Sequence, residues 1–250
     1  MSLGSAEHVA HDSQLTTHDL NQRVATAHGI LGRLGLADYM GHASARLPGT
    51  DHLVTKPRHS TRIRGMTRLK PEQMIVVDLD GGLVEGEDPP AKEVQIHTAI
   101  YRARPDVGGV VHTHQTLATI FGVVGRPILP LLHVEAPLVA HGVPIYPSPE
   151  LIDTPERGDA VARVLGDLPA CHLQGHGIVT VGATVEEATI RAIFLERLAR
   201  ANLLAAQLGG QPRVIPPDEI ARLAAPMVGT DVRWAYYASL LEDDAPLAGF

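Results

Sequence analysis

Apolar residues recur along most of the chain at one of two spacings, the helical and the strand spacing. From Thr17 to Leu36 they recur every three or four positions, which predicts an amphipathic helix. Capping residues and stop signals frame further helical segments. These predicted helices cover residues 91–104, 116–121, 154–165 and 185–208.

Short apolar runs bounded by turn residues predict strands between these helices. The predicted strands cover residues 43–47, 52–55, 74–78, 108–114, 170–173 and 177–181. Because strands and helices interleave without a linker or a repeat, we expect one α/β domain over residues 17–250 with a central sheet. Residues 1–16 are polar and are expected to form a flexible arm, and residues 211–250 are expected to form a C-terminal extension.

Composition and charge exclude several classes of protein. The 250 residues are 44% hydrophobic and 20% charged, which is the balance of a globular chain, and no apolar stretch is long enough to span a membrane. Lys and Arg total 21 against 28 Asp and Glu, so the net charge is −7, opposite in sign to that of most nucleic-acid binders. We therefore expect neither a membrane nor a nucleic acid as a partner. The single cysteine, Cys171, suits a cytoplasmic location.

The chain contains 14 histidines, and three of them are placed for metal binding. His112 and His114 stand one residue apart at the end of an apolar strand, so both project from the same face. His176 lies between two glycines, which permit a close approach of the backbone, and Glu93 adds a carboxylate. Three imidazoles and one carboxylate suit zinc, manganese or iron(II). Hydrogen-bonded core histidines and a solvated glutamate are the alternative interpretation.

Four motifs follow one another in a characteristic order. They are Gly41-His42-Ala43-Ser44-Ala45-Arg46, Glu93 with His97, Val111-His112-Thr113-His114, and Gln174-Gly175-His176-Gly177. In this order and at this spacing they resemble the class II aldolase/adducin family. The resemblance extends over residues 17–210.

The resemblance implies a three-layer α/β/α sandwich with a largely antiparallel central sheet. It also implies a homotetramer with active sites between subunits and one divalent metal ion per subunit, with zinc or manganese favoured over iron. His112, His114 and His176 match the metal-binding histidines of the family, and Glu93 matches a catalytic acid/base that also contacts the metal. A divalent cation stabilises the charge that develops on oxygen when a carbon–carbon bond breaks. His97 is interpreted as structural.

The sequence departs from the sugar-phosphate aldolases of this family at the phosphate site. His42 stands where those aldolases have asparagine. Their phosphate-binding turn contains a glycine, and residues 54–61 of this chain contain no glycine. A side-chain-rich loop with Pro57 does not supply the backbone N–H groups that bind phosphate. This difference favours a small-molecule carboxylate as the substrate, because arginine binds carboxylates in a bidentate way.

The Gly-His-x-Ser-x-Arg form resembles metal-dependent decarboxylases of hydroxylated aromatic or pyridine dicarboxylic acids. We therefore expect a carbon–carbon lyase in the catabolism of aromatic compounds, with Glu93 returning a proton to carbon. Tyr236, near the C-terminus, is expected to be a second catalytic acid. The residues expected to bind substrate are His42, Ser44, Arg46, Arg58 and His59.

Other functions remain open from the sequence. An aldolase acting on a non-phosphorylated or acidic hydroxy-carbonyl compound needs the same metal site. A non-catalytic adducin-like module is a second alternative, although all four candidate ligands are present. An iron-dependent oxygenase is a third. Arg46 has a structural alternative as a salt-bridge residue at the end of its strand, and Arg58 has one as part of a solvated loop.

Overall fold

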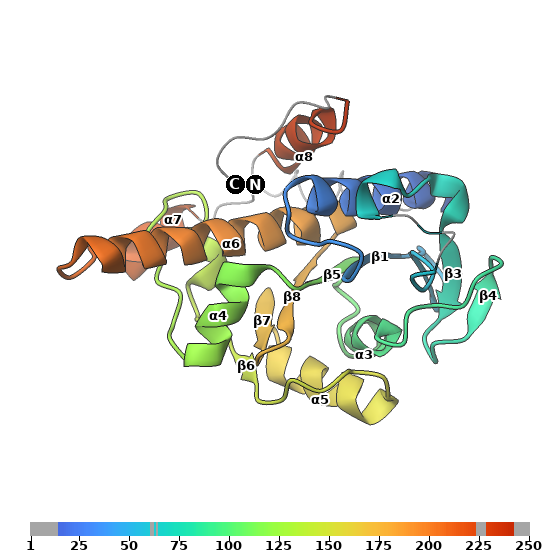
Figure 1. Ribbon diagram of the computed structural model, residues 1–250, viewed down its shortest axis with the longest axis horizontal. Helices are drawn as coiled ribbons and strands as arrows, with labels where there is room; N and C mark the ends of the chain where they lie inside the picture. Colours follow the sequence, from blue (N-terminus) through green and yellow to red (C-terminus); the bar gives the residue numbers. More distant parts are fainter. Residues whose placement is uncertain (1–14, 61–62, 64, 224–228, 243–250) are drawn as a thin grey trace, which may run out of the picture.

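A computed structural model describes residues 15–60, 63, 65–223 and 229–242 (Figure 1). The α-helices are α2 (Thr17–Arg33), α3 (Val94–Ala103), α4 (Thr116–Val124), α5 (Pro155–Leu165), α6 (Val185–Leu208), α7 (Pro217–Leu223) and α8 (Thr230–Ser239). Three short 3-10 helices are η1 (Met66–Arg68), η2 (Pro71–Gln73) and η3 (Ala136–Val139). Residues 1–14 of the expected N-terminal arm lie outside the described residues.

Eight strands form one sheet. They are β1 (His42–Arg46), β2 (His52–Thr55), β3 (Ile75–Asp78), β4 (Leu83–Glu85), β5 (Gly109–Thr113), β6 (Ile145–Tyr146), β7 (Ala170–Leu173) and β8 (Gly177–Gly182). Their order across the sheet is β4-β3-β2-β1-β5-β8-β7-β6. Among the strand pairings of the described residues, only that of β6 with β7 is parallel. The predicted α/β class and the largely antiparallel sheet agree with this arrangement.

Hydrophobic cores lie on both faces of the sheet. Because side chains alternate along a strand, Val110 joins the core under α3 and α5, whereas its neighbour Val111 joins the core under α2 and α6. Figure 1 shows α2 and α6 on one side of the strands and α3 and α5 on the other. Helix α8 packs against α2 and α6. Within the described part of the chain, no helix is long and apolar enough to cross a membrane.

The sheet brings the predicted site motifs together along one edge, where the neighbouring central strands β1, β5 and β8 begin or end. His42 at the start of β1 pairs with His112 near the end of β5, and Thr113 pairs with Ile178 of β8. The turn that joins β7 to β8 carries His176, so it lies beside the end of β5. Helix α3 begins at Val94, three residues later than predicted, which leaves Glu93 at its N-cap and next to this edge.

Candidate metal centre and active site

Four side chains converge at this edge of the sheet. Glu93, His112, His114 and His176 each offer a ligand atom, and these atoms all lie within 4.8 Å of one another. Nε2 of His112 is 3.0 Å from Nε2 of His114. The Glu93 carboxylate lies 3.3 Å from Nε2 of His176 and 3.8 Å from Nε2 of His112. The structure therefore brings together all four residues that the sequence predicts as metal ligands.

Neighbouring backbone groups orient two of these side chains. Nδ1 of His112 lies 2.9 Å from the carbonyl oxygen of Ile178, to which it donates, so the unprotonated Nε2 faces the cluster. The Glu93 carboxylate accepts a hydrogen bond of 3.2 Å from the backbone N–H of Ile152. These contacts fix a nitrogen lone pair and a carboxylate toward one point, as a metal ligand set requires.

Gly177 allows the close approach of the histidines. A Cβ atom at this position would lie 2.4 Å from the carbonyl oxygen of Thr113 and 2.9 Å from the ring of His114. Backbone cannot yield at such a distance, so any larger residue would push the turn that carries His176 away from β5. The glycine after His176 is thus required by the geometry of the cluster.

Burial keeps the imidazoles of His112 and His114 neutral. Loss of solvent, together with the neighbouring imidazoles, holds the pKa of His112 well below its usual range and lowers that of His114 to about 4. Neutral imidazole is the form that binds a metal. The nitrogens of the three clustered histidines and one carboxylate oxygen fit a divalent ion such as zinc or manganese.

His42 lies beside this cluster and connects it to buried side chains in the interior of the protein. Its Nε2 is 4.0 Å from the Glu93 carboxylate, and its Nδ1 is 2.6 Å from Nε2 of His97. His97 in turn contacts Ser44, whose hydroxyl also contacts Tyr101. Ser44 is fully buried within this chain of contacts, so the expectation that it binds substrate is not supported: its hydroxyl faces helix α3.

Arg46 is also placed away from the cluster. Its guanidinium donates to the backbone carbonyl oxygens of Tyr101, Arg104 and Val107, at distances between 2.6 and 3.1 Å. These bonds satisfy the C-terminal end of α3. Arg46 lies at the opposite end of β1 from His42, roughly 13 Å along the strand. It stabilises the end of a helix and does not face the predicted substrate site.

Arg58 and His59 belong to an exposed loop that borders the site. The backbone N–H of Arg58 donates to the carbonyl oxygen of Pro89, shortly before Glu93, over 2.7 Å. The ring of His59 packs against Tyr39, with 4.9 Å between ring centres. Both side chains are exposed, so the structure leaves them available to a substrate without holding them in place.

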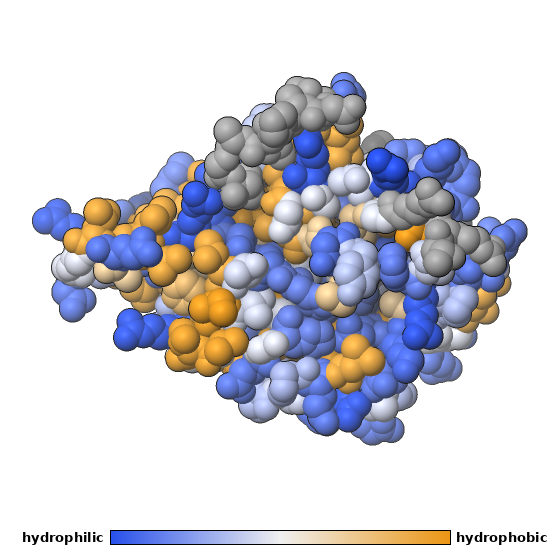
Figure 2. All heavy atoms as spheres, viewed as in Figure 1, coloured by the Kyte–Doolittle hydropathy of each residue, from blue (hydrophilic) through white to orange (hydrophobic). Residues whose placement is uncertain are grey.

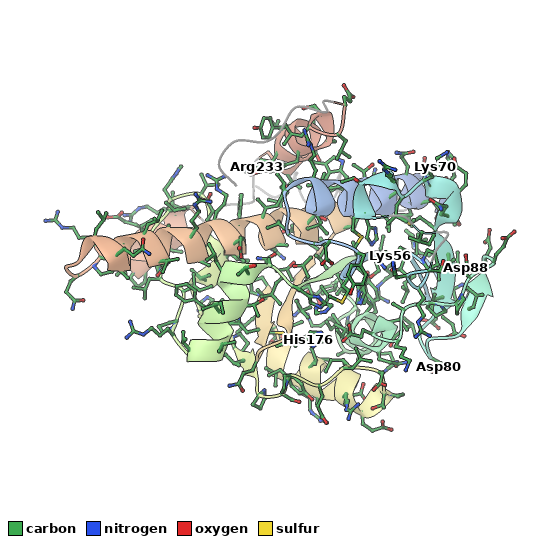
Figure 3. All side chains as sticks on the ribbon, in the orientation of Figure 1. Lys56, Lys70, Asp80, Asp88, His176 and Arg233 are labelled. Atoms are coloured by element: carbon green, nitrogen blue, oxygen red, sulfur yellow. The ribbon has the colours of Figure 1, made fainter. Side chains whose placement is uncertain are left out.

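Two buried basic residues near the site were not among the predicted site residues. Lys56 follows β2 and is only 3% exposed, and burial lowers the pKa of its ammonium to about 8. Its charge acts on both His42 and His28. His28 accepts a hydrogen bond from the backbone N–H of Ala43, which fixes helix α2 to β1. Figure 3 shows Lys56 between α2 and α3. The sequence offered one signal for His28, because this polar residue lies on the apolar face of the predicted first helix.

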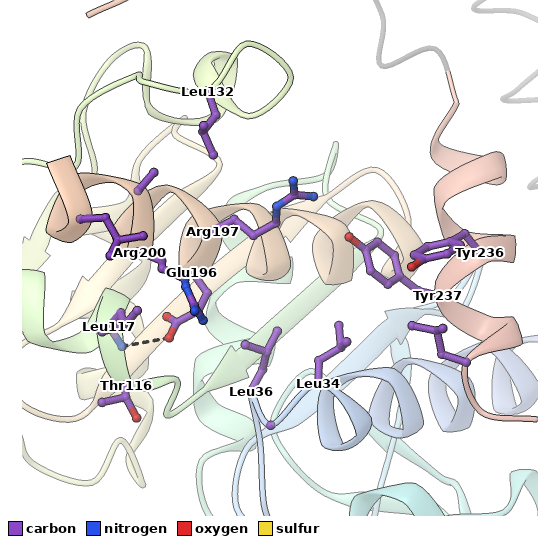
Figure 4. A pocket seen from close by; sticks show the side chains of 14 residues that line it. Leu34, Leu36, Thr116, Leu117, Leu132, Glu196, Arg197, Arg200, Tyr236 and Tyr237 are labelled. Atoms are coloured by element: carbon purple, nitrogen blue, oxygen red, sulfur yellow. Dashed lines mark hydrogen bonds between the residues drawn. The ribbon is translucent and has the colours of Figure 1, made fainter. Parts of the chain in front are cut away.

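Tyr236 faces a different cavity within the chain. It is 60% exposed on α8 and lines a cavity of about 760 Å³ with Glu196, Arg197 and Arg200 of α6 (Figure 4). None of the four clustered ligands lines this cavity. A single copy of the chain therefore does not bring Tyr236 to Glu93, contrary to the expectation of a second acid in the same site.

Comparison with known proteins agrees with this geometry. The family model for the class II aldolase and adducin N-terminal domain matches residues 22–203. The chain belongs to the class II aldolase/adducin family. A solved class II structure, L-fuculose 1-phosphate aldolase from Glaciozyma antarctica PI12, shares the fold with a TM-score of 0.77 and 23% identity, covering 94% of this chain and 96% of that one.

Curated members of the class II aldolase/adducin family include decarboxylases that resemble this chain along most of its length. The 3,4-dihydroxyphthalate decarboxylase of Arthrobacter keyseri is 32% identical over 221 residues, which cover 84% of this chain and 88% of the relative. The enzyme of that name from Terrabacter sp. (strain DBF63) is 33% identical over 229 residues, covering 86% and 94%. The predicted family and the predicted class of activity, a metal-dependent carbon–carbon lyase on the decarboxylase branch, are thereby confirmed.

Proposed function

We propose that this protein removes a carboxyl group, as CO2, from a hydroxylated aromatic dicarboxylic acid of the 3,4-dihydroxyphthalate kind. In this reaction the bond between the ring and the carboxylate breaks, its electron pair stays on the ring carbon, and that carbon takes up one proton. Glu93 would carry this proton to the ring carbon after its carboxylate has taken it up from water; in support, the carboxylate lies within the cluster and is held by a backbone N–H. The convergence of Glu93 with three histidines is the observation that carries this proposal.

His112, His114, His176 and Glu93 would hold one divalent metal ion, for which zinc or manganese is the best fit. When bound, the ion supplies positive charge that stabilises an anionic oxygen of the substrate. The other carboxylate of the substrate requires a cation outside this ligand set. Lys56 is a buried cation whose charge acts on His42, so we assign it this role in place of Arg46, with Arg58 as a second, exposed cation.

An assay of CO2 release tests the function. The purified protein, loaded separately with Zn²⁺ and Mn²⁺ under anaerobic conditions, is offered 3,4-dihydroxyphthalate, a hydroxylated pyridine dicarboxylate and L-fuculose 1-phosphate. We expect release of CO2 from a dicarboxylate and no cleavage of the sugar phosphate. Cleavage of a hydroxy-carbonyl substrate without CO2 would replace the proposal with an aldolase activity. Turnover that depends on iron and consumes oxygen would replace it with an oxygenase activity.

Lys56 gives a more specific prediction. Lys56→Met keeps the buried aliphatic stem and removes the charge, so we expect KM for the dicarboxylate to rise roughly 10- to 100-fold, the loss of one hydrogen bond to a charged group. Arg46→Met is the matched control. It also removes a cation, from the neighbouring strand β1, but Arg46 binds backbone carbonyl oxygens and does not face the site. Steady-state kinetics measure both. An unchanged KM in Lys56→Met would remove Lys56 from the substrate site.

We further propose that the protein acts as a homotetramer with its active sites between subunits. Apolar side chains gather over α4 and the adjoining part of α6 (Figure 2). Ile120, Val123, Val124 and Leu204 are each between 46% and 59% exposed. Burial of such side chains against another copy would remove them from water, and a neighbouring copy could then bring its Tyr236 to Glu93.

We also propose that the fold is a three-layer α/β/α sandwich in a single domain and that the protein is cytoplasmic. Helices on both faces of the sheet support the three-layer α/β/α sandwich, and the packing of α8 against α2 and α6 supports a single domain over residues 17–250. Cys171 is a buried thiol, which supports a cytoplasmic location.

A further inference from the structure

A chain of hydrogen bonds runs from the interior of the protein to the candidate site. Tyr101 lies 2.8 Å from the hydroxyl of Ser44, and this hydroxyl lies 2.6 Å from Nδ1 of His97. Nε2 of His97 lies 2.6 Å from Nδ1 of His42. All four side chains are buried. Each contact has room for one hydrogen, so the direction of the first bond determines the direction of all the others.

The surroundings of Tyr101 decide the direction of the first bond. Apart from Ser44, the acceptor near its hydroxyl is the carbonyl oxygen of Gly108 at 3.5 Å, beyond the usual range of O–H···O bonds. Tyr101 therefore gives its hydrogen to Ser44.

The other bonds follow from this choice. Ser44, which accepts from Tyr101, gives its single hydrogen to Nδ1 of His97. Because burial lowers the pKa of His97 to about 3, this ring is neutral and carries its one hydrogen on Nε2. That hydrogen is donated to Nδ1 of His42.

We propose that Tyr101, Ser44 and His97 are positioning residues that hold His42 in the tautomer with its hydrogen on Nε2. The position of His42 at the end of these hydrogen bonds agrees with this direction. Its Nε2 lies 4.0 Å from the Glu93 carboxylate, which attracts an N–H group and repels a lone pair. His42 then presents a fixed hydrogen-bond donor at the edge of the cluster.

This donor has a role in the reaction if the proposed function is right. A neutral N–H group beside Glu93 binds an anionic carboxylate or phenolate oxygen of the substrate and cannot serve a ligand that needs an acceptor. The opposite tautomer would present a lone pair to that oxygen. The three buried residues thereby make His42 selective for an anionic group without contacting the substrate.

Nuclear magnetic resonance of the metal-free protein tests the proposal without any substrate. In protein with ¹⁵N-labelled histidine, long-range ¹H–¹⁵N correlation distinguishes protonated from unprotonated ring nitrogens, and His42→Gln and His97→Gln assign the signals. We expect both His42 and His97 to carry the hydrogen on Nε2. Hydrogen on Nδ1 of His42 in the native protein would overturn the proposal.

Substitutions at Ser44 and Tyr101 test whether these hydrogen bonds determine the tautomer of His42. Ser44→Ala removes the donor to His97, so we expect a mixture of tautomers at both rings and a roughly 10-fold lower kcat/KM, the loss of about one hydrogen bond. Tyr101→Phe should produce the same spectral change, and it tests the proposal if Ser44→Ala fails to fold. Unchanged tautomers in either folded variant would contradict the proposal.

Thr180→Val is the matched control. It removes a buried hydroxyl that donates to Ala188 over 2.8 Å in the same sheet, outside the chain of contacts. It should lower stability without a change of tautomer. If the spectra show the expected tautomer but no dicarboxylate is decarboxylated, the proposed function fails and this inference stands.

Discussion

Replacement of His112 by alanine is expected to abolish both the retention of one zinc or manganese ion per chain and the lyase activity. His112 occupies the centre of the cluster, because its Nε2 lies 3.0 Å from His114 and 3.8 Å from Glu93. It is also the ligand whose lone pair is fixed by a backbone carbonyl. Substitution of groups that only orient a metal ligand lowers affinity roughly 10- to 100-fold, so loss of the ligand itself should lower it by more than about 100-fold.

Two measurements check this result. Metal content after dialysis gives the stoichiometry, and thermal unfolding with and without added Zn²⁺ gives the stabilisation by the bound ion. The native protein should gain stability with Zn²⁺, whereas His112→Ala should not. His172→Ala is the matched control, because His172 is an equally buried histidine on β7 outside the cluster. A full complement of metal in His112→Ala would show that the ion is held elsewhere.

The metal ligands could be predicted from the sequence because local patterns fix them. His112 and His114 share a face through the alternation of a strand, and the glycine after His176 marks a turn that must approach another chain segment. Glu93 was a candidate because it stands four residues before His97 on the predicted helix, but only the family resemblance favoured it over a solvated glutamate, since no local pattern distinguishes the two. The long helix α6 and the strands β2 and β7 have the predicted bounds, because their apolar runs end at clear turn or capping signals.

The substrate-binding residues depend on geometry that one sequence does not contain. Ser44 and Arg46 share a motif with His42, but their side chains meet α3, and where α3 packs is a property of the tertiary structure. The role proposed for Lys56 depends on the pairing of β2 with β1, which brings its charge close enough to act on His42. Strand β4 was missed because its side chains are all exposed and show no alternation of apolar and polar residues.

Glu93→Gln is expected to lower kcat by roughly 10²- to 10⁴-fold, the range for loss of a general acid. The amide keeps an oxygen that can accept the hydrogen bond from Ile152, so the side chain should stay in place. What the amide lacks is a proton that it can give to the ring carbon after CO2 leaves. Because the substrate is bound by other groups, KM should change much less than kcat, and the split between them is measured at saturating metal.

The control must separate proton delivery from metal binding and from general loss of structure. Glu186→Gln changes a carboxylate of similar burial that pairs with Arg23 over 2.7 Å, away from the cluster, and should leave kcat within a factor of about two because a partly exposed ion pair contributes little. If added Zn²⁺ or Mn²⁺ restores the activity of Glu93→Gln, the carboxylate serves only as a ligand. A kcat that remains 10²-fold low at full metal occupancy supports proton delivery by Glu93, since failure to retain the metal then no longer explains the loss.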